Sequence, residues 1–175
     1  PAHRADALRH LLDVYQQEKE WESAITTARR LQGLGGERLG PLMAQFACEL
    51  AELKIAANAE MGEVRQLIKR AFGFDSQSVR ASLLLGDIEQ QEGRWRAALK
   101  AYQRVESQDI DFVPEVIERL EACYQALGQA EQYKHELQRL LKRDVSDMIV
   151  LKLTDLIAAD EGKEAAAAFL ADHVG

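Results

Sequence analysis

Residues that end helices recur at a nearly constant spacing along this chain. Gly93, Gly128 and Gly162 lie 35 and 34 residues apart, and each follows an expected helix. Lys19 holds the same place two units before Gly93. Apolar residues recur at three- and four-residue steps almost throughout the sequence, which indicates helices, and strand-like alternation is absent from it. A period near 34 residues made of two helices predicts a solenoid, in which each hairpin needs its neighbours to bury its apolar face.

Short turn signals between the apolar segments predict ten helices. They are expected at about 5–18, 21–32, 41–58, 62–72, 77–92, 95–107, 114–127, 130–143, 147–160 and 163–173. These pair into five helical hairpins with little linker between them. We expect a single repeat domain over 1–175, with units at about 5–38, 41–76, 79–112, 114–146 and 148–174.

Small and aromatic residues stand where stacked helices need them. Gly86 and Ala98 leave room for two helix backbones to approach, and Tyr102, four residues after Ala98, is expected to fill the gap against the next unit. Trp21 and Trp95 each follow a turn, where an indole would close the base of a hairpin. The pattern therefore predicts packing between repeats as well as within them.

Composition excludes several other classes of protein. Apolar residues make up 47% of the 175 residues and charged residues 29%, which is typical of a folded soluble protein. A net charge of −7 repels phosphate backbones, so we do not expect nucleic-acid binding. The longest apolar run, at 165–171, is far shorter than the roughly 20 residues that cross a bilayer. Because the chain opens on Pro-Ala-His, we expect it to be part of a longer protein.

The sequence shows no arrangement of cysteines, histidines or carboxylates that is typical of a catalytic or metal site. Cys48 and Cys123 are too few for a disulfide framework, and each lies on an apolar helix face, where a free cysteine acts as a small hydrophobic residue. The four histidines show no i, i+4 pair, and neither a phosphate loop nor a nucleophile–base motif is present in the sequence. An enzyme built on a helical bundle would need inward carboxylates or histidines at metal spacing. We therefore expect no catalysis.

Two units carry a recognisable repeat pattern. They resemble tetratricopeptide repeats at Leu11, Tyr15, Ala24 and Leu31 in the first unit, and at Leu85, Gly86, Ala98, Tyr102 and Val105 in the third. The other units are degenerate, and the second is the weakest match. The expected fold class is all-α: a right-handed α-solenoid of about five tetratricopeptide-like helical hairpins.

The order of longer motifs points to a narrower family. "ALRHLLDVYQQEKEWESAITTARRL" at 7–31, "FACELA" at 46–51, "SVRASLLLGDI" at 78–88, "YQRVESQD" at 102–109 and "CYQALG" at 123–128 together resemble the lipopolysaccharide assembly protein B (LapB) family. The resemblance covers nearly the whole chain. It implies the central and C-terminal part of that family's repeat array.

The resemblance also implies a function. Family members are protein-binding adaptors that regulate lipopolysaccharide (lipid A) synthesis in Gram-negative bacteria. They act at the cytoplasmic face of the inner membrane, where they help a membrane-bound AAA protease to degrade the lipid A deacetylase. The partners implied are therefore these two proteins. The alternative is a generic tetratricopeptide assembly or co-chaperone platform, whose groove would carry several Lys and Arg residues to clamp a terminal carboxylate.

The family also has parts that this sequence lacks. One is an N-terminal membrane-anchoring helix, and the other is a C-terminal rubredoxin-like module that binds metal through four cysteines. Cys48 and Cys123 do not form that module's Cys-x-x-Cys pairs. We therefore expect this fragment to be soluble, to bind no metal or cofactor, and to meet the membrane only through the absent anchor.

The candidate partner-binding residues are those expected on the concave face, which the first helix of each unit lines. They are Arg9, Asp13, Gln16, Phe46, Glu49, Leu53, Arg80, Leu83, Asp87, Gln90, Glu118 and Gln125. Their mixed chemistry suits an extended or helical segment of a partner. The acidic segment 106–121 could dock a basic partner, but we favour the interpretation that its carboxylates complement a helix that starts near Pro114.

Overall fold

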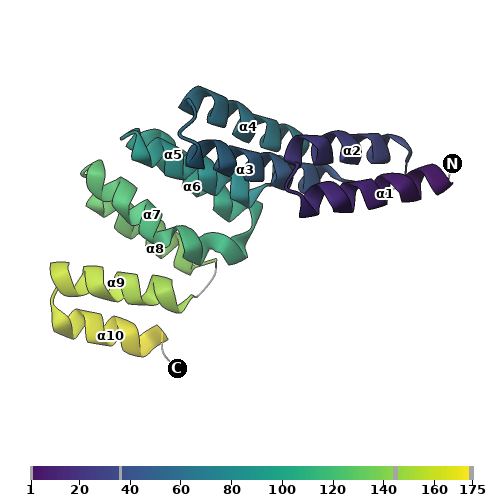
Figure 1. Cartoon of the computed structure of the whole chain (residues 1–175). Helices are drawn as coiled ribbons and strands as arrows, with labels where there is room; N and C mark the ends of the chain where they lie inside the picture. Colours follow the sequence, from purple (N-terminus) through teal and green to yellow (C-terminus); the bar gives the residue numbers. More distant parts are fainter. Residues whose placement is uncertain (1, 36, 144–145, 174–175) are drawn as a thin grey trace. The chain divides into compact units, whose positions relative to one another are not determined.

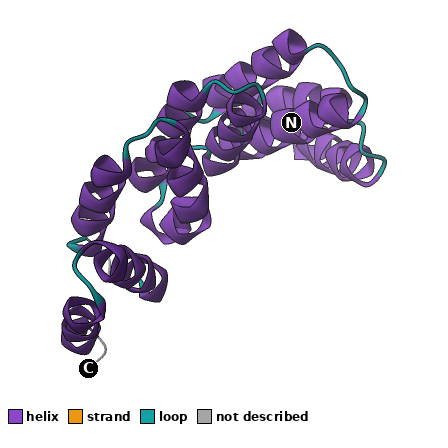
Figure 2. Cartoon of the chain, turned by 90° about the vertical axis from the view of Figure 1, so that its left-hand side faces the viewer, coloured by secondary structure: helices purple, strands orange, loops and turns teal. Residues whose placement is uncertain are grey.

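The computed structural model describes residues 2–35, 37–143 and 146–173. Every regular element in these ranges is a helix, as Figure 2 shows by colour. The helices are α1 (Ala2–Gln17), α2 (Trp21–Gly33), α3 (Gly40–Ala56), α4 (Met61–Phe74), α5 (Val79–Gln91), α6 (Trp95–Gln108), η1 (Ile110–Phe112), α7 (Val113–Ala126), α8 (Ala130–Leu141), α9 (Asp147–Asp160) and α10 (Lys163–His173). The predicted all-α class is confirmed.

Neighbouring helices pair as hairpins along the chain (Figure 1). α1 packs on α2, α3 on α4, and α9 on α10. The helices begin and end within a few residues of the predicted bounds, and the ten expected α-helices are all present. The short 3₁₀ helix η1 was not predicted, because three residues are too few to show a period. A fold of successive tetratricopeptide-like hairpins is thereby confirmed.

The chain forms two compact units, Pro1–Ile88 and Glu89–Gly175, and the boundary falls inside α5. Unit 1 contains α1 to α4 and most of α5, and unit 2 contains the rest. Each unit is described by itself below. The single repeat domain over 1–175 stays a prediction. Within the described residues, no helix combines the length and the apolar character that crossing a membrane requires.

The turn inside each of the five hairpins contains a residue with a positive φ. It is the second residue after the first helix, and its φ is 58° at Lys19, 54° at Asn58, 71° at Gly93, 66° at Gly128 and 95° at Gly162. In the first four of these turns the next backbone N–H donates to a carbonyl of the first helix; for example, the Glu20 N–H donates to the Tyr15 carbonyl at 2.8 Å, and the Arg94 N–H to the Glu89 carbonyl at 2.8 Å. Such a left-handed residue ends a helix by satisfying its free carbonyls. The predicted equivalence of Lys19 with the glycines is confirmed.

The connections between hairpins repeat as well. Asp75 and Asp109, 34 residues apart, both adopt extended backbone at the end of a second helix. The Asp75 carboxylate accepts from the Gln77 N–H at 2.9 Å, and the Asp109 carboxylate accepts from the Asp111 N–H at 3.1 Å. Aspartate is favoured here because its short side chain mimics the next turn of backbone.

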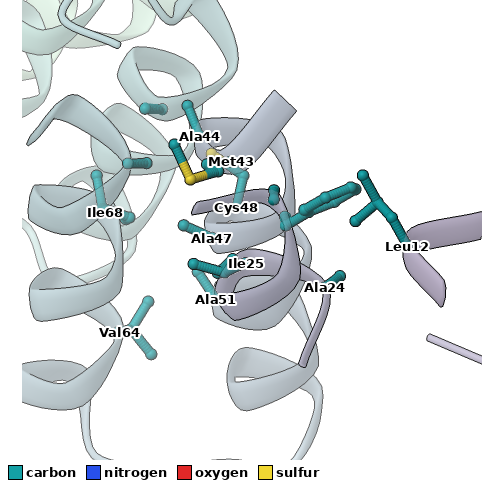
Figure 3. Close-up of a cluster of buried hydrophobic side chains, with 14 of the residues drawn as sticks. Leu12, Ala24, Ile25, Met43, Ala44, Ala47, Cys48, Ala51, Val64 and Ile68 are labelled. Carbon is teal, nitrogen blue, oxygen red and sulfur yellow. The ribbon is translucent and has the colours of Figure 1, made fainter. Parts of the chain in front are cut away.

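The core of unit 1 is built from small side chains (Figure 3). Ala24 and Ile25 of α2, Ala47 and Cys48 of α3 and Ile68 of α4 are all buried. Alanines allow the three helices to approach closely, and the branched side chains fill the space between them. The apolar spacing on these helices therefore sets which face each one buries.

Unit 2 buries larger residues between its helices. Ala98 and Tyr102 of α6 are fully buried, and the Tyr102 hydroxyl donates to Gln90 Oε1 at 3.0 Å. Leu137 of α8 and Leu153 of α9 are also fully buried. The tyrosine thus buries its ring while its hydroxyl keeps a polar partner.

Candidate functional site

Arg80 links two first helices of unit 1, α5 and α3. The Arg80 side chain, on α5, donates to Glu49 Oε1 at 2.6 Å and to Glu52 Oε2 at 2.7 Å, both on α3. Burial alone would lower the pKa of Arg80, but the hydrogen bonds to the two carboxylates raise it overall. Sequence reasoning placed Arg80 and Glu49 on one face, and the structure brings them into contact. The Arg80 guanidinium is thus paired with the carboxylates of Glu49 and Glu52.

Arg9 is held by a different contact at the start of the chain. Its Nε and Nη2 donate to Glu37 Oε1 at 2.8 and 2.6 Å, and its Nη1 donates to Asp6 at 2.9 Å. Glu37 precedes α3, so Arg9 ties α1 to the connection that leads into the second hairpin. Asp13 is exposed and Gln16 is half-buried on the same helix.

Phe46 does not line a partner-binding face, which corrects the prediction. It is 1% exposed and belongs to the core of unit 1. Its ring stacks on that of Trp21 with the centroids 5.7 Å apart. The error arose because α3 is apolar on more than one side, so spacing alone did not show which apolar residues are covered. Leu53, seven residues later, is 48% exposed.

The remaining predicted residues divide between the units. Leu83 and Asp87, in unit 1, are half-buried on α5. In unit 2, Gln90 is the acceptor of the Tyr102 hydroxyl, whereas Glu118 and Gln125 are exposed on α7.

The first-helix surface of unit 2 combines α7 with α9. We call it the α7–α9 face and define it by Glu115, Glu118, Glu121, Met148, Leu151, Lys152 and Asp155. Lys152 Nζ donates to Glu121 Oε2 at 2.6 Å and so joins the two helices. Leu151 is 57% exposed and Met148 is 38% exposed. Sequence reasoning missed the α9 part, although Met148, Leu151 and Asp155 share a helical spacing opposite the buried Ile149 and Leu153.

The acidic segment 106–121 does not form one patch. Arg139 makes two hydrogen bonds to the Glu106 carboxylate, at 2.8 and 2.6 Å, and Arg143 also pairs with Glu106. These hydrogen bonds, above all those from Arg139, lower the pKa of Glu106. Glu115 stands in the first turn of α7, as the helix-dipole interpretation expects. The segment therefore supplies ion pairs between hairpins, a helix start, and the exposed Glu118.

The two thiols are placed as core residues. Cys48 and Cys123 are fully buried, and burial raises the pKa of each to about 11. Burial that disfavours the thiolate suits cysteines that act as small hydrophobic residues of the core. In the part of the chain that the structure describes, no group of three or more His, Cys, Asp or Glu side chains could hold a metal ion.

Comparison with known proteins supports the resemblance seen in the motifs. The chain is 36% identical to lipopolysaccharide assembly protein B of Escherichia coli (strain K12) over 167 residues, which covers 95% of this chain and 43% of that protein. It is 31% identical to the protein of the same name from Haemophilus influenzae over 170 residues, covering 97% and 42%. The chain thus spans less than half the length of these curated relatives. No protein-family model matches it.

Solved structures show the same fold at low sequence identity. PilF of Pseudomonas aeruginosa is 19% identical with a TM-score of 0.53, and the match covers 99% of this chain and 78% of PilF. A crystal structure of MamA is 12% identical with a TM-score of 0.54, covering 94% and 92%. At these identities the likeness concerns the fold alone. The predicted resemblance to the LapB repeat region is confirmed by the curated relatives.

Proposed function

We propose that this chain is a protein-binding scaffold that serves lipopolysaccharide assembly as an adaptor. The observation that carries this is the 36% identity to lipopolysaccharide assembly protein B, sustained over 95% of the chain. The fold supports it, because stacked helical hairpins present long surfaces suited to other proteins. The role requires neither a cofactor nor nucleic acid.

The finer proposal concerns the partners and the place of action. The full-length parent brings a membrane-bound AAA protease together with the lipid A deacetylase, at the cytoplasmic face of the inner membrane, and so limits lipid A synthesis. The motif resemblance supports this assignment. The first-helix faces also support it, since their mixture of charged, amide and apolar groups suits a segment of a folded or unfolded protein.

The ion pairs of Arg80 and Lys152 count against the alternative function, a co-chaperone or assembly platform that binds a terminal carboxylate. A co-chaperone that clamps a terminal carboxylate needs cationic side chains that are free to bind it. Arg80 is already engaged by Glu49 and Glu52, and Lys152 by Glu121. These contacts favour an adaptor that recognises internal segments of its partners.

A capture experiment tests the proposal. The chain is immobilised and exposed separately to the purified protease and the purified deacetylase. We expect at least one of them to bind, and we expect Leu53→Asp to weaken that binding roughly tenfold, because it puts a charge in place of an exposed apolar contact. The matched control is Gln66→Asp on the second helix α4, which adds the same charge and should leave binding unchanged. Failure of the parent chain to capture either protein would refute the proposal.

A further inference from the structure

The α7–α9 face exposes two large apolar side chains, Leu151 and Met148. Leu151 is the most exposed large apolar side chain in the described part of the chain, at 57%, and Met148 lies one turn before it. On the opposite side of α9, Ile149 and Leu153 are buried in the core. Ile149 and Leu153 therefore form the core-facing side of α9, whereas Met148 and Leu151 face away from the core. Neighbouring exposed apolar side chains are the kind of surface that a partner can cover.

Carboxylates lie near Lys152, the residue that follows Leu151. Lys152 hydrogen-bonds to Glu121, which raises its pKa; burial acts in the opposite direction, and the charges of Glu121, Glu118 and Asp155 raise the pKa further. Three carboxylates thus act on one ammonium group. Glu121 is used by this pair, but neither Glu118 nor Asp155 hydrogen-bonds another side chain within residues 2–35, 37–143 and 146–173. The residues that define the face include four carboxylates and one ammonium group, so the face has an excess of negative charge.

The charge decides among the possible occupants. Phosphate groups of lipids or nucleic acids would be repelled. A second copy in a two-fold contact would meet this surface with the same surface, so Glu118 and Asp155 would face like charges. A partner with cations beside an apolar side chain would instead satisfy both parts of the face.

We propose that the α7–α9 face binds a basic amphipathic segment of a partner protein. An apolar side chain of that segment packs on Leu151 and Met148, and its Lys or Arg groups pair with Glu118 and Asp155. The inference rests on the proposed function, because it specifies the chemistry of the partner that the first-helix surface accepts.

The test uses two synthetic peptides with the full chain. Both form an amphipathic helix with one leucine face; the other face is lysine in the first peptide and glutamate in the second. We expect the Leu/Lys peptide to bind at physiological salt, and the Leu/Glu peptide not to bind. The double variant Glu118→Gln, Asp155→Asn should lower the affinity about tenfold, since close charge pairs across an interface carry such weight. Leu151→Ser should lower it about fivefold through lost apolar contact.

Matched variants separate the site from general attraction. Glu131→Gln with Glu164→Gln removes the same charge from second helices, and Leu34→Ser removes an exposed leucine from unit 1. Both should bind the Leu/Lys peptide as the parent does. Equal weakening by these controls, or no binding by the parent chain, would overturn the inference. Failure of the peptide test alongside intact capture of the protease or deacetylase would overturn the inference alone, whereas loss of that capture would refute the proposed function.

Discussion

At the scale of single residues, the hairpin turns show how a local conformation can use different side chains. Gly93, Gly128 and Gly162 adopt positive φ without steric cost, because glycine has no Cβ. Lys19 and Asn58 adopt the same conformation with a side chain present. An L-residue in this region costs roughly 1–2 kcal/mol, and asparagine tolerates it better than most. The first two turns are therefore strained relative to the last three.

Replacing these two residues should relieve that strain. We expect Lys19→Gly to raise the free energy of unfolding by roughly 0.5–1 kcal/mol, and Asn58→Gly to raise it by less. The control is Gln66→Gly inside α4. It should lower the free energy of unfolding by about 1 kcal/mol, because glycine increases the conformational entropy of the unfolded chain. Urea titration followed by circular dichroism measures all three. A lower urea midpoint for Lys19→Gly would contradict the left-handed conformation at this turn.

At the scale of elements, the second hairpin depends on one close approach between helix ends. α3 begins at Gly40, and a Cβ built there would lie 2.6 Å from the Phe74 carbonyl oxygen at the end of α4. The entry to α3 is further fixed by the Leu39 N–H, which donates to Gln32 Oε1 at 2.9 Å. Phe74 in turn lies beneath Arg29 and Arg70, whose guanidinium carbons are 5.5 and 5.6 Å from its ring centre. Three helices thus converge on the Gly40–Phe74 contact.

Any side chain at Gly40 must displace that backbone. Gly40→Ala should lower the free energy of unfolding by about 1–3 kcal/mol, because the clash is with a carbonyl that cannot rotate away. Gly62→Ala is the matched control: a Cβ there meets nothing within 4 Å, and alanine is the better helix former. Thermal melts of both variants should move in opposite directions. If Gly40→Ala had the same melting temperature as Gly62→Ala, α3 and α4 would not make this contact.

At the scale of the whole molecule, ion pairs link successive hairpins within each unit. Arg80 joins α5 to α3 in unit 1. In unit 2, Glu106 joins α6 to α8, and Lys152 joins α9 to α7. Each link is a charged contact at the edge of an apolar interface, where partial burial strengthens it. Stability against acid should therefore depend on the carboxylates of these links.

Glu106 is the residue at which this dependence on pH can be tested. Its folded-state pKa is lowered from 4.5, so its contribution to stability is complete above that value and is lost as the pH falls through the lower folded-state pKa. Glu106→Gln should cost roughly 2 kcal/mol at pH 7, and the difference from the parent should shrink as the medium is acidified toward pH 3. Urea midpoints across this range test it, with Glu131→Gln on α8 as the exposed control. A difference that stays constant with pH would exclude the ion pair as its cause.

Most of the fold could be predicted from the sequence, because helix ends and repeat spacing are local signals. The turn at Lys19 was placed correctly without any glycine, since the flanking helices fixed its position. The binding face was harder to predict. Phe46 was assigned to the binding face wrongly, because burial depends on which helix covers which. The exposed residues of α9 were left out of that face, because Leu151 resembles a core leucine until its neighbours are known. The pairing of Glu106 with Arg139, 33 residues away, likewise requires the fold.

The shared corner at Lys19, Asn58, Gly93, Gly128 and Gly162 has an evolutionary consequence. A gene that gains or loses the segment between two such corners joins the remaining helices through a turn that again contains a residue with a positive φ. Such a chain can become longer or shorter by whole hairpins while the turns between helices stay of one kind. Divergence can then proceed module by module, with one hairpin free to acquire a new specificity while the others preserve the frame.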